Sequence, residues 1–88
     1  METRMNAGYT ITDSVHIGNA EFVIGENHTQ YGTMYVTWEC KDGDSYFWGH
    51  YLSSRQAAET DLLDRAGREL EFQNRQKEKQ AKSKERER

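Results

Sequence analysis

The spacing of apolar residues changes once along the chain, at residue 53, and this change constrains the fold more than any other feature. Before it, apolar and polar side chains alternate as in half-buried strands, over residues 8–17, 20–26, 31–41 and 44–51. After it, apolar residues recur every fourth position, as in the stripe of an amphipathic helix: Ala58, Leu62, Ala66 and Leu70. The sequence therefore predicts several strands followed by one helix.

Two glycine-containing pairs mark hairpins between these strands. Gly18-Asn19 is a tight-turn pair, and Asp42-Gly43 favours a type I′ turn, which needs positive φ at both central residues. The run Ser53-Ser54-Arg55-Gln56 is typical of a capping box at a helix start. Short sequential hairpins place neighbouring strands side by side. The predicted fold is α+β: a four-stranded antiparallel β-meander with one long C-terminal amphipathic helix packed on one face, in the order ββββα.

A chain of 88 residues forms one domain at most. We divide it into a flexible N-terminus at residues 1–7, an α+β domain at residues 8–72, and a charged, basic segment at residues 73–88. That last segment is expected to be either a helical extension or a disordered tail. A helix over residues 53–80 would be about 42 Å long, against about 20–26 Å for the strands, so its end must outrun the sheet.

The residue types argue against catalysis, metal binding and membrane insertion. Cys40 is the only cysteine, which leaves no internal disulfide and no cysteine-based zinc site. The three histidines show no metal-ligand spacing, and no nucleophile or phosphate-loop motif is present. We therefore predict no enzyme activity, no cofactor and no metal. The lone thiol and the absence of a signal peptide or a long apolar run favour a cytoplasmic protein without a membrane span.

The two faces of the sheet are expected to differ in their role. In the third strand, Trp38 belongs to the more apolar set with Met34 and Val36, so this set is expected to face the helix. In the fourth strand, Phe47 and Tyr51 are expected to face the helix as well. The opposite face, which no helix covers, is then rich in aromatic and acidic groups and is the predicted partner-binding surface. Its proposed contact residues are His16, Glu21, Tyr35, Glu39, Tyr46, Trp48 and His50.

The charge distribution indicates the kind of partner. Residues 1–52 contain seven acidic and two basic side chains, whereas residues 75–88 contain three acidic and seven basic ones. An acidic face with aromatic anchors suits a basic protein surface, with electrostatic steering of the encounter. Two alternatives stay open: a homodimer formed by two uncovered faces, and weak nucleic-acid binding through the tail. The expected tail contacts are Arg75, Lys77, Lys79, Lys82 and Lys84.

The run "YVTWECKDGDSYFWGHYLSS", followed by an alanine-containing helix, resembles a group of small proteins from conjugative and phage-derived elements of Firmicutes. The resemblance covers about residues 7–70, and its most specific parts are "TWEC" and "YFWGHY". It carries over no activity and no catalytic residue. It implies an anti-defence setting, including anti-CRISPR proteins, which are often small, acidic and non-enzymatic. The layout also loosely resembles integrase arm domains and the sheet domains of some antitoxins, but the strands lack the basic residues of the arm domains.

Overall fold

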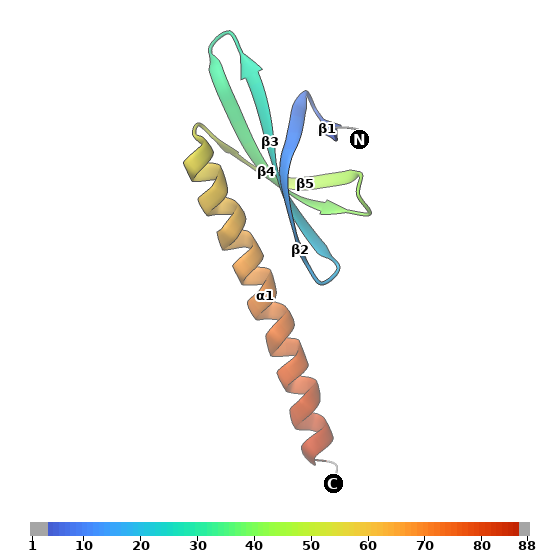
Figure 1. The fold of residues 1–88 in the computed structure, drawn as a ribbon. Coiled ribbons are helices and arrows are strands. Elements are labelled where there is room, and N and C mark those ends of the chain that lie inside the picture. Colours follow the sequence, from blue (N-terminus) through green and yellow to red (C-terminus); the bar gives the residue numbers. More distant parts are fainter. Residues whose placement is uncertain (1–3, 87–88) are drawn as a thin grey trace.

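The computed structural model describes residues 4–86, with side chains up to Lys77, and shows one sheet and one long helix (Figure 1). The five strands are hydrogen-bonded in sequence order and are antiparallel throughout. The elements are β1 (Met5–Asn6), β2 (Tyr9–Ile17), β3 (Ala20–Thr29), β4 (Gly32–Lys41), β5 (Ser45–Leu52) and α1 (Arg55–Arg86). The predicted α+β class, meander and C-terminal helix are confirmed.

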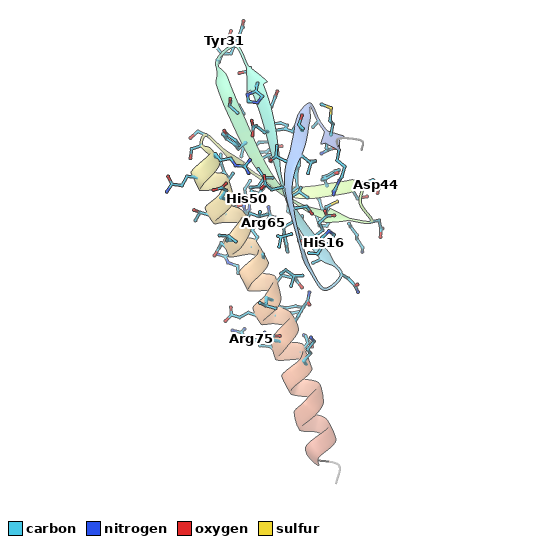
Figure 2. All side chains as sticks on the ribbon, viewed as in Figure 1. His16, Tyr31, Asp44, His50, Arg65 and Arg75 are labelled. Atoms are coloured by element: carbon cyan, nitrogen blue, oxygen red, sulfur yellow. The ribbon has the colours of Figure 1, made fainter. Side chains whose placement is uncertain are left out.

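The prediction of four strands is wrong, because β1 adds a fifth within the segment expected to be flexible. Met5 pairs with Thr10, and Asn6 pairs with Tyr9. The strand predicted to end at residue 26 instead continues through a polar segment, and β3 ends at Thr29. The β3–β4 hairpin therefore extends past the rest of the sheet, and Tyr31 lies at its tip with 91% of its surface exposed (Figure 2).

The predicted turns are confirmed, and the helix starts one residue later than a capping box of Ser53 and Gln56 would place it. Gly18 has φ +60°, and Asp42 and Gly43 have φ +58° and +78°, as a type I′ turn requires. At the start of α1, the Oγ atom of Ser54 accepts a hydrogen bond from the backbone N–H of Ala57 at 3.1 Å. Ser54 is thus the N-cap, and α1 begins at the next residue.

A β-bulge at Thr12 divides β2 between the two faces of the sheet. Ile11 pairs with Gly25 and Asp13 with Ile24, so Thr12 has no partner on β3. The extra residue shifts the alternation by one. Residues before the bulge, such as Ile11, pack on the face away from the helix, and those after it, such as Val15, pack under the helix.

Each face of the sheet has its own small core, which corrects the predicted face assignment. Under the helix, the buried residues are Phe22, Ile24, Ala58, Leu62 and Ala66. On the opposite face, they are Val23, Val36, Trp38 and Cys40, flanked by Tyr9, Ile11 and Tyr46. Trp38 and Val36 therefore point away from the helix, while Tyr35 and Thr37 point toward it.

The face away from the helix is covered because the sheet curls until its two ends approach each other. The Nε atom of Arg4 lies 3.1 Å from the hydroxyl of Tyr46, and the rings of Tyr9 and Tyr51 lie 6.4 Å apart. These contacts join the β1–β2 end of the sheet to β5. The expected orientation of Tyr51 toward the helix is therefore wrong, and the homodimer hypothesis loses the uncovered face on which it depended.

An ion pair between Arg4 and Glu21 closes this second core. Nη1 of Arg4 lies 2.8 Å from Oε2 of Glu21, which also accepts a hydrogen bond from the Ser14 hydroxyl. Burial acts to raise the pKa of Glu21, but the hydrogen bonds from Arg4 and Ser14 and the charge of Arg4 lower it below its usual value of 4.5. Glu21 is thus a structural carboxylate that is largely inaccessible to a partner.

Acidification is expected to destabilise the fold through Glu21. Because its folded-state pKa lies below 4.5, its contribution is complete above that value and is lost as the pH falls through the folded-state pKa. In urea unfolding at pH 7, Glu21→Gln should cost on the order of 1–3 kcal/mol. At pH 3 the difference from the wild type should shrink, and an equal cost at both pH values would contradict this role.

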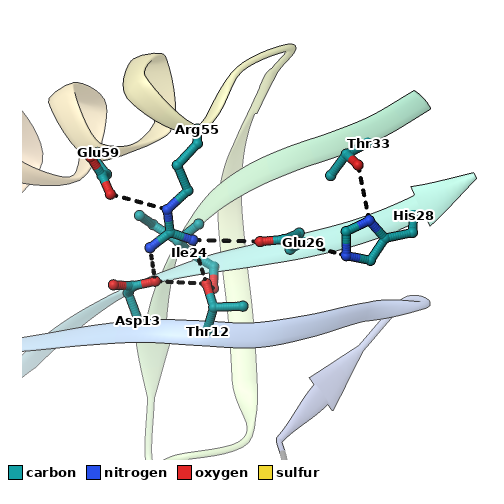
Figure 3. A network of polar contacts seen from close by, with 8 residues as sticks. All are labelled: Thr12, Asp13, Ile24, Glu26, His28, Thr33, Arg55 and Glu59. Carbon is teal, nitrogen blue, oxygen red and sulfur yellow. Dashed lines mark hydrogen bonds and ion pairs between the residues drawn. The ribbon is translucent and has the colours of Figure 1, made fainter.

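Polar contacts hold the helix to the sheet at two places, near the start of α1 and at Gln73. At its start, the guanidinium of Arg55 pairs with Asp13 beside the β2 bulge, with Glu26 at 3.6 Å and with Glu59 at 3.0 Å (Figure 3). Farther along, Nε2 of Gln73 donates to the carbonyl oxygen of Ile17 at 2.8 Å.

Beyond Gln73, α1 continues to Arg86 and extends past the sheet (Figure 1). These thirteen residues correspond to about 20 Å of helix. No helix among the described residues is long and apolar enough to cross a membrane.

Candidate functional site

The backbone of Trp48 adopts a conformation that bulky residues rarely occupy. Its φ is +53°, in the left-handed region, and it lies in a second bulge, where Trp48 and Gly49 together oppose Trp38 of β4. Such a conformation costs about 1–3 kcal/mol and is common at functional sites. Trp48 is nevertheless 70% exposed, and its ring contacts Phe47 edge-to-face with 4.9 Å between centroids.

A shallow groove runs beside Trp48, between β5 and α1. We call it the Trp48 groove, and it has a volume of about 380 Å³. It is lined by Phe22, Glu39, Trp48, His50, Arg65, Arg68 and Glu69. A second hollow of about 450 Å³ shares Glu39, Trp48 and Glu69 and continues along Phe47 toward Gln73. The bulge thus places an exposed indole between two adjoining hollows.

The wall of the groove toward the helix is a polar cluster around Thr37. The Thr37 hydroxyl donates to the carboxylate of Asp61, which also lies 2.9 Å from Nδ1 of His50. Nη1 of Arg65 donates to the carbonyl oxygen of Thr37 at 3.0 Å and contacts its hydroxyl at 3.2 Å. Figure 2 shows His50 and Arg65 at the junction of sheet and helix.

Two pKa values in this cluster reflect its burial. Burial acts to raise the pKa of Asp61, but hydrogen bonds from Thr37 and His50 lower it below the usual value. Burial lowers the pKa of Arg65, against the opposing effect of the charges on Asp61 and Glu39. Asp61 is thus a stably ionised carboxylate with its partners in place, whereas Arg65 is a partly desolvated cation.

The structure separates the predicted partner-binding residues into two groups. Glu39, Trp48 and His50 line the Trp48 groove, and Tyr35 packs against the core on the same face. The other three lie on the opposite face: His16 is exposed, and Glu21 and Tyr46 are bound to Arg4. Trp48 and His50 thus lie on the helix side of the sheet, contrary to the face assignment from the sequence.

The predicted tail contacts lie outside the groove. Arg75 pairs with Glu71 at 3.7 Å, and Lys77 is exposed. Lys79, Lys82 and Lys84 lie outside the residues whose side chains the structure describes.

The helix side of the groove was not predicted from the sequence. Arg65, Arg68 and Phe72 follow one another at spacings of three and four residues, which places them on one flank of α1. Phe72 is 57% exposed and lies well away from the apolar stripe of the helix. Phe72 does not line the groove, so the spacing of Arg65 and Arg68 on one flank of the helix was the available signal in the sequence.

Other parts of the described surface offer less chemistry. A hollow of about 610 Å³ at the start of α1 is lined by small and polar side chains with two carboxylates, Asp61 and Asp64, and by no aromatic or basic group. Among the described residues, no group of three or more histidine, cysteine and acidic side chains could hold a metal ion. Comparisons of the chain with protein families, curated proteins and solved structures find no match. The Trp48 groove is therefore the candidate functional site.

Proposed function

We propose that this protein is a non-enzymatic binding module that engages a protein partner through the Trp48 groove. The observation that supports this most is the exposed indole of Trp48, held at φ +53° between two hollows. Tryptophan and arginine are the residue types that most often dominate binding energy at protein interfaces. A strained, exposed tryptophan beside Arg65 and Arg68 has the composition of such an anchor.

The groove gives little support to an enzymatic role. Thr37, the hydroxyl nearest to His50 and Asp61, has no exposed surface, so a substrate cannot reach it. His50 and Thr37 both bind the same carboxylate of Asp61, so the histidine is not placed to activate the hydroxyl. The groove is also shallow and open rather than enclosed, which suits contact with a macromolecule.

The charge of the strands adds a long-range component to the proposal. Residues 1–52 contain seven acidic and two basic side chains, and their field would speed the approach of a partner with a basic surface. Inhibition or regulation on behalf of a mobile genetic element, in the manner of anti-CRISPR proteins, is the biological setting we propose. That setting is supported by the resemblance of the segment at residues 35–54 rather than by geometry.

A second candidate function is weak nucleic-acid binding by the end of α1. The helix continues past Gln73, which makes its last hydrogen bond to the sheet among the described side chains, and residues 75–88 contain seven basic and three acidic side chains. Binding of this kind is dominated by phosphate contacts and weakens steeply with salt. A gel shift at low salt that is lost on deletion of residues 75–88 would support it, whereas retention by the truncated chain would contradict it.

The protein-binding proposal predicts a specific loss on removal of the indole. Immobilised wild-type protein, Trp48→Ala and Tyr31→Ala should be compared for capture from a host lysate, with quantification by mass spectrometry. Tyr31 is a matched control because it is a more exposed aromatic at the far tip of the β3–β4 hairpin. A partner should be retained by the wild type and Tyr31→Ala and lost by about tenfold or more with Trp48→Ala.

The captured protein must then be purified and titrated against the same three proteins. A dissociation constant unchanged by Trp48→Ala would reject the groove as the binding site. Circular dichroism of Trp48→Ala should match that of the wild type, which excludes unfolding as the cause of any loss.

A further inference from the structure

Arg65 is a partly buried cation without an ion pair among the described residues. Its Nη1 atom donates to the carbonyl oxygen and hydroxyl of Thr37, and its guanidinium carbon lies 5.8 Å from the centroid of the Phe22 ring. The other arginines whose side chains are described, Arg4, Arg55, Arg68 and Arg75, each pair with a carboxylate within 4.0 Å. Arg65 alone among them has none, although it is placed deeper than exposed Arg68.

A cation in this position is unusual, because charged groups are seldom removed from water without a paired countercharge. The side chain of Arg65 is only partly exposed, and this burial lowers its pKa. The carboxylate of Asp61 is occupied by Thr37 and His50, and Glu39 acts on Arg65 through space without a hydrogen bond. Only Nη1 has hydrogen-bond acceptors within the described chain, so Nε and Nη2 are available to another group.

The side chain of Arg65 forms part of the wall of the Trp48 groove. Arg65 and Arg68 line the Trp48 groove from the helix, and Trp48 and His50 line it from β5. Asp61 holds the ring of His50 through Nδ1, and the Nε2 atom has no hydrogen bond among the described residues. A group entering beside the indole would therefore meet a guanidinium with free donors and an imidazole nitrogen.

We propose that the groove accepts a single carboxylate, an aspartate or glutamate side chain of a partner polypeptide, on the guanidinium of Arg65, with a neighbouring flat or apolar residue packed on Trp48. A carboxylate matches the guanidinium fork with two parallel hydrogen bonds. Glu39 and Glu69 line the same groove, and their charge disfavours a doubly charged phosphate more than a singly charged carboxylate. This inference depends on the proposed function: a partner with a basic surface would present one acidic side chain to Arg65, and the basic groups around it would face the acidic strands.

Nuclear magnetic resonance titration with short peptides tests the proposal directly. The probes are acetyl-Phe-Glu-amide, the matched uncharged acetyl-Phe-Gln-amide, and inorganic phosphate, each added to isotopically labelled protein. The indole N–H signal of Trp48 and the Nε–H signal of Arg65 are followed. Acetyl-Phe-Glu-amide should shift both signals to saturation and bind about tenfold or more tightly than the glutamine peptide, as expected for a charge-assisted hydrogen bond.

Two variants separate Arg65 from an arginine outside the groove. Arg65→Gln should remove the preference for the glutamate peptide, whereas Arg75→Gln, a matched change at an exposed arginine that does not line the groove, should alter the dissociation constant by less than about threefold. If Arg65→Gln does not fold, the Nε–H signal of Arg65 in the wild type still decides the question.

Three results would overturn the inference. Equal dissociation constants for the two peptides would show that the groove binds polypeptides without distinguishing a carboxylate from an amide. The proposed function would then still stand. Tighter binding of phosphate than of the glutamate peptide would show that the class of anion is wrong. No shift of the Arg65 signal with the glutamate peptide would remove Arg65 as the receptor, and the proposed function would then be decided by the Trp48→Ala titration.

Discussion

Trp38→Ala is expected to destabilise the fold by about 3–5 kcal/mol, whereas Trp48→Ala should change its stability by less than about 1 kcal/mol. Trp38 is only 4% exposed and packs against Val23, Val36 and Cys40 on the face away from the helix. Its ring also contacts Tyr9 edge-to-face with 5.6 Å between centroids. Removing the indole leaves a cavity in a core that has few other residues to fill it.

Trp48 is the matched comparison, since it is the only other tryptophan and lies 70% exposed. Its loss forfeits one edge-to-face contact with Phe47, worth about 0.5–1.5 kcal/mol, while alanine keeps the Cβ atom and with it most of the cost of the positive φ. The net change in stability should therefore be small.

Urea unfolding followed by far-ultraviolet circular dichroism measures both variants on the same scale. A chain of this length has only about 4–13 kcal/mol of stability in total, so Trp38→Ala can unfold it completely. Trp38→Phe, which retains a ring, then gives a measurable intermediate cost. Equal costs for Trp38→Ala and Trp48→Ala would contradict the separation of a buried tryptophan from a binding one.

Gly49→Ala is expected to destabilise the fold by about 1–3 kcal/mol, the usual cost of forcing extra volume into a packed core. A Cβ atom at residue 49 would lie 2.8 Å from Nε1 and 3.0 Å from Cδ1 of Trp38. The side chain of Trp38 is buried and cannot move away without opening the second core. The bulge thus requires glycine at this position because of the close approach of the indole.

Gly67→Ala is the control for this substitution and should have the opposite sign. Gly67 lies within α1, and a Cβ atom there would meet nothing within 4 Å. Alanine in a helix interior is favoured over glycine by about 1 kcal/mol. The melting temperature should rise for Gly67→Ala and fall for Gly49→Ala, and a change of the same sign in both would contradict the packing of Trp38 on Gly49.

The candidate site was only partly predictable from the sequence. Trp48, His50 and Glu39 were predicted as binding residues because they were expected on the face of the sheet that no helix covers, whereas the structure places them in a groove on the helix side. Their partners Arg65 and Arg68 were not predicted, because charged residues on a helix are usually only its solvated side. These strand residues and the two arginines line one groove only because α1 lies beside β5 in the folded chain. That arrangement depends on contacts between residues distant in sequence.

The face assignment failed for two physical reasons. In β4, whose register with β3 is unbroken, the more apolar set with Trp38 was expected to face the helix, but the curl of the sheet buries this set on the opposite face. In β2 and β5, the reason is a bulge. Alternation of period two identifies which residues share a face only while the strand is regular, and one inserted residue reverses every side chain beyond it. Bulges at Thr12 and at Trp48-Gly49 do this twice in the sheet. Gly49 within an aromatic strand was a signal of the second bulge, since an isolated glycine in a strand often marks one.

The sequence by itself determined the local elements, because these depend on residues close together in the chain. The period of the apolar residues set the strands and the helix, Asp42-Gly43 set a turn, and Ser54 set the helix start. The tertiary structure decided which core each strand face joins, since that choice depends on bulges and on the curl that brings Arg4 to Tyr46. The run at residues 45–51 contains both outcomes: Tyr46 closes a core that the chain covers itself, and Trp48, two residues later, lies exposed beside a groove.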